Sequence, residues 1–341
     1  MTRYSLVLLV ALAGCMGDAP RENPFDPNSE RYDDAGTVSG VVTGIYPQPN
    51  GQFSGRAGVR VRVMPVDGGV ERVTTTDENG EFSIEDLPTD PEGTDYLVRA
   101  EGPGLREAET TVPVTARENA RVLLRLDALP IVETQAVRTV HIEQWFPGET
   151  IYRLEVEATV SDPDRATDVD SVAIVAEGLG DEPEFRAPLV ETSPGRFQAT
   201  FRPEQLPGGQ VQALLGRPLR IEVTDLSGNV GQGLPLALVR VIEQTPLTAS
   251  PQGSETVMRN PPTLTWRPTP IPFAYTYRVD VNLIDGAGIP NLIETARQID
   301  PGALQYDVQR TLAPGNYFWT LWVVDEAGNR SRSKEAGFVV P

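Results

Sequence analysis

The chain contains one histidine, His141, and one cysteine, Cys15, so few catalytic sites can be assembled from it. A Ser-His-Asp site would have to use His141, and nothing nearby in the sequence supports one. A catalytic zinc site usually takes two or three histidines among its ligands. His141 lies in the strand-like run Val140-His141-Ile142-Glu143, which predicts an exposed strand residue. The sequence therefore predicts no enzymatic activity and no cofactor.

Acidic residues are the remaining source of metal ligands. Calcium prefers clustered oxygen ligands, and the best candidates are four closely spaced aspartates, Asp162, Asp164, Asp168 and Asp170. Their spacing does not match the EF-hand loop, and an Asp-Pro-Asp run also shapes turns through its own side chains. We expect no metal site, with calcium at these four residues as the alternative.

Aromatic residues gather in the expected strand at 317–324. Alternation predicts that one face of this strand packs into a core, namely Tyr317, Trp319, Leu321 and Val323. The opposite face, which holds Phe318, Trp322 and Val324, is expected to be exposed in a lone sandwich.

Two further tyrosines, Tyr275 and Tyr277, share one face of another expected strand. Exposed flat rings stack on sugar rings or receive a partner protein. The sequence therefore predicts a ligand or partner platform made of Phe318, Trp322, Tyr275 and Tyr277. The alternative is that a loop or the neighbouring domain covers these rings, and Trp145-Phe146 raises the same question.

Short alternating strands must position all of these side chains. The 341 residues include 31 glycines and 31 prolines, many of them in short clusters between Val-, Thr- and Leu-rich runs. No stretch sustains the apolar spacing of an amphipathic helix. This pattern predicts an all-β chain of three tandem β-sandwich domains, at residues 37–129, 130–243 and 244–341.

The formal net charge of −19 constrains the partners. A surface this acidic repels nucleic acid and anionic lipid headgroups, so neither is an expected partner. The proline-rich, polar segment after Cys15, up to residue 36, cannot bury enough apolar surface to order itself, and we expect a flexible tether there.

The first fifteen residues carry a targeting pattern. Arg3 precedes an apolar run at 6–13, and the run ends in Leu12-Ala13-Gly14-Cys15. This arrangement resembles the lipobox of bacterial lipoproteins. The resemblance implies a signal peptide at 1–14, cleavage before Cys15 and lipid attachment to it, so that the protein meets a membrane through its anchor. The apolar run is about half of the roughly 20 residues that span a bilayer.

Two consequences follow from that resemblance. Met16, rather than an acidic residue, follows the cysteine, which favours the outer membrane within the cell envelope. Lipidation of the sole cysteine also excludes disulfides, although the destination is oxidising.

The first domain has a recognisable strand order. Residues 74–84 read as a hairpin with an Asn79-Gly80 turn, and the other marks are Gly40 and Val42, Ala57-Gly58-Val59, and Tyr96. This order resembles the carboxypeptidase regulatory-like domain, which implies a transthyretin-like sandwich and a non-catalytic module.

The other two domains show looser resemblances. Residues 130–243 are similar to bacterial immunoglobulin-like domains. In the third domain, Trp266 in a Thr-Leu-Thr-Trp strand and Tyr317 after Ala313-Pro314-Gly315 resemble the core tryptophan and tyrosine corner of fibronectin type III domains. Asp225-x-x-Gly-Asn229 recurs as Asp325-x-x-Gly-Asn329 before each final strand, which indicates tandem sandwiches of related design.

These observations predict a non-catalytic, lipid-anchored protein of the cell envelope that presents β-sandwich modules as binding or spacer elements. One alternative is a carbohydrate-binding surface lipoprotein with a glycan as its partner. Another is a docking component of an envelope assembly, with an envelope protein as its partner.

Overall fold

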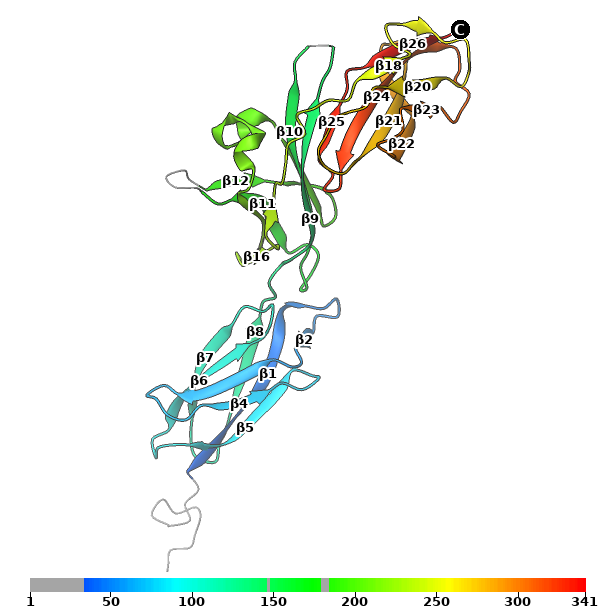
Figure 1. The fold of residues 1–341 in the computed structure, drawn as a ribbon. Helices are drawn as coiled ribbons and strands as arrows, with labels where there is room; N and C mark the ends of the chain where they lie inside the picture. Colours follow the sequence, from blue (N-terminus) through cyan, green and yellow to red (C-terminus); the bar gives the residue numbers. More distant parts are fainter. Residues whose placement is uncertain (1–33, 146–147, 179–183) are drawn as a thin grey trace, which may run out of the picture. The chain divides into compact units, whose positions relative to one another are not determined.

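Residues 34–145, 148–178 and 184–341 are described by a computed structural model (Figure 1). In these ranges the chain consists of β-strands joined by turns, without an α-helix, and its three short 3₁₀ helices are η1 (Pro203–Gln205), η2 (Pro207–Gly209) and η3 (Val211–Leu214). No helix in the described part is long and apolar enough to cross a membrane. The predicted all-β class is confirmed. The chain separates into two compact units, residues 1–128 and 129–341.

The first unit is a sandwich of two four-stranded sheets. One sheet is centred on β1 (Ala35–Pro47), which pairs antiparallel with β2 (Phe53–Gly55) and β5 (Glu81–Pro88) and parallel with β8 (Asn119–Leu126). The other sheet has the order β4 (Arg72–Thr75), β3 (Arg60–Pro65), β6 (Thr94–Glu101) and β7 (Ala108–Val114).

The core of this unit follows the alternation in the sequence. Val59, Val61 and Val63 are buried between the sheets, with Arg60 and Arg62 on the outer face. On β1, residue 40 has to be glycine, because a Cβ there would lie 2.1 Å from the carbonyl oxygen of Val122 on β8.

The prediction of a hairpin at residues 74–84 is wrong, although the predicted turn at Gly80 is present. Gly80 has a φ of 78°, and its N–H donates to the carbonyl of Asp77 at 3.0 Å. However, β4 pairs with β3 in one sheet and β5 pairs with β1 in the other. The chain therefore passes from one sheet to the other between β4 and β5. The buried Thr76 hydroxyl holds the chain at this point, since it accepts the Val59 N–H at 2.9 Å and donates to the Arg56 carbonyl at 2.6 Å.

The second unit begins with strands β9 to β17, which we call the β9–β17 half. One of its sheets has the order β13 (Val190–Ser193), β14 (Arg196–Phe201), β10 (Ile151–Ser161) and β9 (Ile131–Ile142). The other contains β12 (Phe185–Pro188), β11 (Val169–Ala176), β15 (Pro218–Asp225), β16 (Val230–Gln232) and β17 (Leu236–Ala237). Apolar residues of both sheets form one buried cluster.

Strands β18 to β26 form the rest of the unit, which we call the β18–β26 half. Its larger sheet contains β22 (Pro290–Ile299), β21 (Tyr275–Ile284), β24 (Gly315–Asp325), β25 (Arg330–Arg332), β26 (Ala336–Val340) and β19 (Glu255–Thr256). The smaller sheet has the order β18 (Thr248–Ser250), β20 (Thr263–Trp266) and β23 (Gln305–Asp307). A second cluster of buried apolar residues lies between these sheets.

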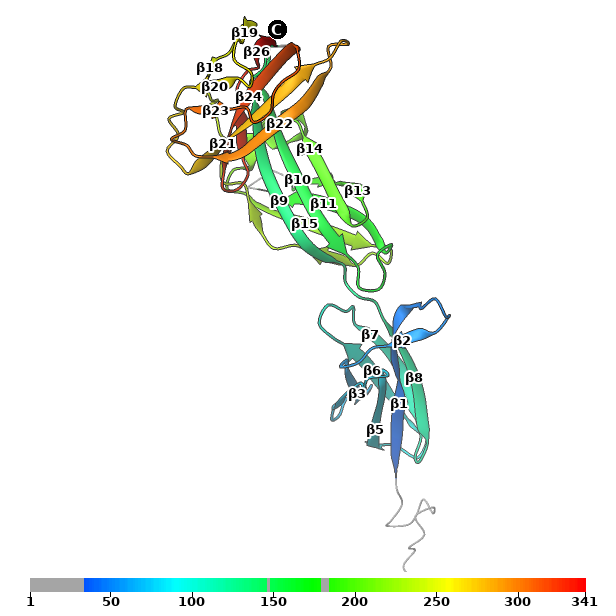
Figure 2. The ribbon, with the colours of Figure 1, turned by 90° about the vertical axis from the view of Figure 1, so that its right-hand side faces the viewer.

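One sheet runs through both halves of this unit. β25 pairs in parallel with β9, so that Arg330, Ser331 and Arg332 lie opposite Val140, His141 and Ile142. The result is a ten-stranded sheet that extends from β13 to β22 (Figure 2). The domain boundary predicted at 243/244 lies inside this unit and stays a prediction.

Candidate functional site

The predicted anchor cannot be placed in the structure. Cys15 and the lipobox residues Leu12, Ala13 and Gly14 lie outside the described residues. Lipidation, the signal peptide and the outer-membrane location therefore stay predictions.

The core face of β24 is as predicted. Tyr317, Trp319, Leu321 and Val323 are all buried, and Trp266 on β20 packs against Trp319 with ring centres 6.4 Å apart. The Tyr317 hydroxyl donates to the Ala313 carbonyl at 2.9 Å, which is the backbone contact that defines a tyrosine corner. The local geometry of these residues confirms their predicted resemblance to fibronectin type III domains.

The prediction that Tyr277 belongs to an exposed platform is wrong. Tyr277 lies directly opposite Val323 of β24, and residues paired in this way point to the same face, which here is the core. Its side chain is wholly buried, and its hydroxyl accepts the Thr269 N–H at 3.0 Å. Tyr275 is half-buried, and its hydroxyl donates to the Thr269 carbonyl at 3.0 Å. No flat aromatic strip can form from these two tyrosines.

Trp322 lies on the opposite face of β24 but is half-buried rather than open. Its Nε1 donates to Oδ2 of Asp280 at 2.9 Å. Three guanidinium groups surround the ring centre, those of Arg278 at 5.5 Å, Arg330 at 5.7 Å and Arg332 at 5.9 Å. Cation–π contacts of this kind stabilise the local sheet surface, so Trp322 is engaged within the protein.

Phe318 lies on the same face as Trp322, about 13 Å away along the strand. There it lines a hollow of about 640 Å³ together with Trp145, whose side chain is 66% exposed. The sequence singled out both rings but gave no sign that they meet, because Trp145 follows β9 and Phe318 belongs to β24. Phe146 lies outside the described residues.

The prediction that His141 is exposed is wrong. The side chain is buried at the contact between β9 and β25, and its ring stacks on Tyr152 with centres 4.4 Å apart. Nδ1 lies 2.9 Å from the Ile242 carbonyl oxygen, so Nδ1 carries the proton and donates. β25 pairs with β9 at Val140, His141 and Ile142, so the sheet continues past β9 where His141 lies.

The repeated Asp-x-x-Gly-Asn motif folds into the same turn twice. In both copies the backbone N–H of the asparagine donates to Oδ1 of the aspartate, and the asparagine Nδ2 donates to Oδ2. Both distances are 2.7 Å in the Asp225 copy. In the Asp325 copy they are 2.8 Å and 3.0 Å. The intervening glycines have φ values of 84° and 85°. The second copy also lies at the contact between the halves, because Oδ1 of Asn329 accepts the Thr139 N–H at 2.9 Å.

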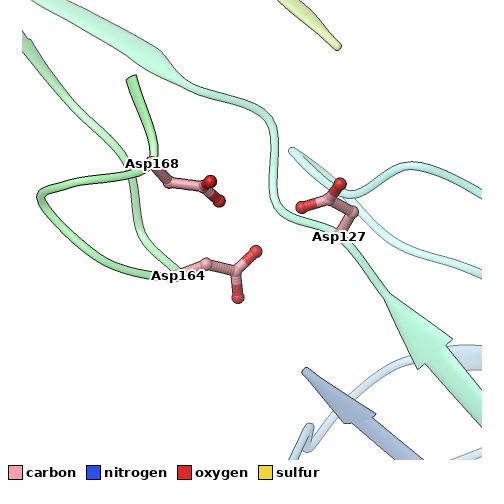
Figure 3. A group of neighbouring side chains, drawn as sticks. All are labelled: Asp127, Asp164 and Asp168. Atoms are coloured by element: carbon pink, nitrogen blue, oxygen red, sulfur yellow. The ribbon is translucent and has the colours of Figure 1, made fainter. Parts of the chain in front are cut away.

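The four calcium candidates lie in or next to the loop between β10 and β11. Figure 3 shows Asp164 and Asp168 with their carboxylates on the same side of this loop, and one oxygen of each lies within 4.8 Å of the other. Asp162 does not join them in a convergent group, and Asp170 is exposed on β11. Asp127, also drawn in Figure 3, belongs to the first unit.

Asp162 has a structural role in this loop. Its Oδ1 accepts the Asp164 N–H at 2.8 Å, which is the turn-shaping contact expected of an Asp-Pro-Asp run. Burial raises the pKa of the Asp162 carboxyl to about 6; the hydrogen bond from Asp164 opposes this shift, and the negative charge of Asp168 adds to it. The calcium alternative at the four aspartates stays a prediction.

Comparisons with known proteins agree with the first part of this description. Residues 37–127 match the family model of the carboxypeptidase regulatory-like domain, which confirms that resemblance. No curated protein matches the chain.

Three solved structures are reported as similar to this chain. The FN1–FN3 domains of chicken CNTN1 are 11% identical, with 84% of this chain and 93% of that chain covered and a TM-score of 0.33. A DUF3823 family protein from Bacteroides ovatus is 14% identical, with 60% and 98% covered and a TM-score of 0.26. The Bacillus anthracis TIE protein is 10% identical, with 90% and 48% covered and a TM-score of 0.26. At such low TM-scores these likenesses carry no weight for the site.

Proposed function

We propose that this protein is a non-catalytic, lipid-anchored spacer of the bacterial cell envelope, held at the outer membrane through Cys15. The observation that carries the spacer role is the junction between the β9–β17 and β18–β26 halves. A spacer has to keep its modules at a fixed separation, and this junction joins two cores through one sheet and a buried polar network.

The polar network at the junction is buried and paired. Thr139 is 1% exposed, and its hydroxyl lies 3.1 Å from the Arg240 carbonyl and 3.2 Å from Oδ1 of Asn329. Ser331, fully buried, lies beside His141 on the neighbouring strand. Nε2 of His141 makes no hydrogen bond, but the paired groups favour a single geometry, because any other arrangement leaves them without partners.

Charged pairs flank this network. Arg330 of β25 donates to Glu155 of β10 at 2.5 Å, and Nε of Arg240 lies 3.3 Å from Oδ2 of Asp325. The Asp325 side chain is 1% exposed, so its pairing with Arg240 lies at a buried position. The Arg330–Glu155 pair joins the two halves, and the Arg240–Asp325 pair joins the β18–β26 half to the segment between the halves.

The segment between the halves is packed rather than loose. Leu238 and Ile242 are each 1% exposed, and they belong to the hydrophobic clusters of the first and the second half respectively. Flexible linkers are rich in glycine and serine and are solvated. The connection here therefore supports a fixed arrangement within residues 129–341.

Fatty-acid labelling tests the anchor. The wild-type chain should incorporate an azido fatty acid and fractionate with outer membranes, whereas Cys15→Ser should do neither. Incorporation that is unchanged in Cys15→Ser contradicts the anchor without bearing on the spacer role.

Spin-label distances test the spacer role. Val190 on β13 and Leu292 on β22 are exposed strand residues in different halves, and cysteines placed there in the Cys15→Ser background are the only thiols to label. The doubly labelled chain should show a distance distribution as narrow as that of a control pair at Val190 and Val230, both in the β9–β17 half. A broad distribution for the first pair alone would show that the halves move independently and would refute the spacer.

A further inference from the structure

The hollow beside Phe318 has the composition of a ligand site. Its lining includes Trp145, Phe318 and Ile284 as apolar surfaces and Thr248, Gln252 and Glu335 as polar groups. Its volume of about 640 Å³ lies within the range of roughly 300–1,000 Å³ that small-molecule sites occupy. All of these residues belong to the second unit.

Trp145 is held in place while its ring stays in solvent. Nε1 donates to the Glu335 carbonyl at 2.7 Å, and the backbone N–H donates to the Glu335 carboxylate at 3.1 Å. The Lys334 ammonium lies 4.5 Å from the ring centre. These contacts fix the ring, but 66% of the side chain remains exposed, so packing of a core does not account for the residue.

Gly337 leaves the floor of the hollow open. It lies opposite Phe318 in the β24–β26 pair, in the interior of β26. A Cβ at this position would meet nothing closer than 3.8 Å, and the residue does not adopt a left-handed conformation, so the fold does not require glycine here. A glycine in a strand interior weakens the strand and often marks close approach of a ligand. Its effect here is to leave the Phe318 ring without a cross-strand side chain on the β26 side, while Asn282 lies opposite Phe318 on β21.

We propose that this hollow binds a neutral saccharide. A sugar ring presents an apolar C–H face, which suits the Trp145 and Phe318 rings, and a rim of hydroxyls, which suits the Gln252 amide, the Thr248 hydroxyl and the Glu335 carboxylate. Lys334 and Glu335 carry opposite charges, so the lining favours neither an anion nor a cation. A purely apolar peptide side chain would leave the polar rim unpaired.

Calorimetric titration of the full chain tests this proposal. The protein is kept in a detergent without a sugar headgroup and titrated with maltotetraose, cellotetraose, chitotetraose and mannotetraose. At least one of them should bind. Loss of ring stacking in Trp145→Ala and filling of the hollow in Gly337→Leu should each weaken binding by about tenfold or more.

A matched control separates the hollow from exposed aromatics in general. Phe53 in the first unit is also an exposed ring with a cation over its face, that of Arg125 at 4.3 Å, and Phe53→Ala should leave binding unchanged. Trp145→Ala removes an exposed side chain and should keep the far-UV circular dichroism spectrum, which shows that any loss is not due to unfolding.

Two results would overturn the proposal. One is the absence of binding to all four oligosaccharides. The other is sugar binding that persists in both Trp145→Ala and Gly337→Leu. In the first case, binding of an apolar peptide, acetyl-Leu-Phe-Leu-Phe-amide, that these two variants abolish would assign the hollow to a peptide. None of these results affects the anchor or the spacer role.

Discussion

Replacing Asn229 or Asn329 by alanine tests whether the two halves of the second unit unfold together. Each asparagine donates its Nδ2 to the buried carboxylate of its own turn, at 2.7 Å in the first copy and 3.0 Å in the second. A hydrogen bond to a charged acceptor contributes about 1.5–3 kcal/mol. Asn229→Ala should therefore lower the free energy of unfolding by about this amount.

Asn329→Ala should cost more, because Asn329 has a partner in the other half. Its Oδ1 accepts the Thr139 N–H at 2.9 Å, and Thr139 is 1% exposed. Removing the acceptor leaves a buried donor unpaired, which adds about 1–3 kcal/mol. The total for this variant is about 2.5–6 kcal/mol.

Urea unfolding followed by tryptophan fluorescence is the assay. All four tryptophans belong to the second unit, and Trp266, Trp319 and Trp322 lie in the β18–β26 half. The assay uses the Trp145→Phe background, in which every remaining tryptophan lies in the β18–β26 half. Asn229 lies in the other half, so its replacement there moves the fluorescence midpoint only if both halves unfold as one. We expect both variants to have a lower urea midpoint than the wild type, and Asn329→Ala to have the lower midpoint of the two. A shift of the circular dichroism transition in Asn229→Ala without a shift in fluorescence would show independent halves and refute the reasoning.

Three further changes have defined outcomes. Tyr317→Phe removes the hydrogen bond to the Ala313 carbonyl and should lower the free energy of unfolding in urea by about 1–2 kcal/mol. An unchanged free energy would show that the tyrosine corner does not stabilise the fold. Gly40→Ala places a Cβ 2.1 Å from a backbone oxygen, so circular dichroism should show the first unit destabilised while tryptophan fluorescence of the second unit is unchanged. Asp162 is 6% exposed and its pKa is raised to about 6, so ionisation disfavours the native state and stability should fall as the pH rises from about 4 to about 6. Asp162→Asn should abolish this fall and raise the free energy of unfolding by about 1–3 kcal/mol at pH 7 in EDTA. A higher Tm of the wild type in millimolar calcium would instead indicate that the loop binds a cation.

Local features of the fold could be predicted from the sequence. Alternation identified the buried valines of β3 and the core face of β24, because each depends only on neighbouring residues. The two Asp-x-x-Gly-Asn turns were likewise readable, since the aspartate, the glycine and the asparagine supply their own hydrogen bonds and backbone freedom.

The errors concern pairing between distant strands. The turn at Gly80 was predicted, but which strand each flank joins depends on β3 and β1. Tyr277 faces the core because of its register with β24, and His141 is buried because β25 covers the edge of β9. The meeting of Trp145 with Phe318 has the same origin. A single sequence does not encode such long-range pairing in a readable pattern.

The parallel pairing of β9 with β25 has a mechanical consequence. Tension applied between residue 129 and Ser333, directly after β25, pulls β9 toward its amino end and β25 toward its carboxyl end. Because these two strands run in the same direction, their ladder is loaded in shear, and its hydrogen bonds resist together instead of opening one after another as in a peeled hairpin. The three residue pairs of this ladder are therefore placed to resist a pull along the chain.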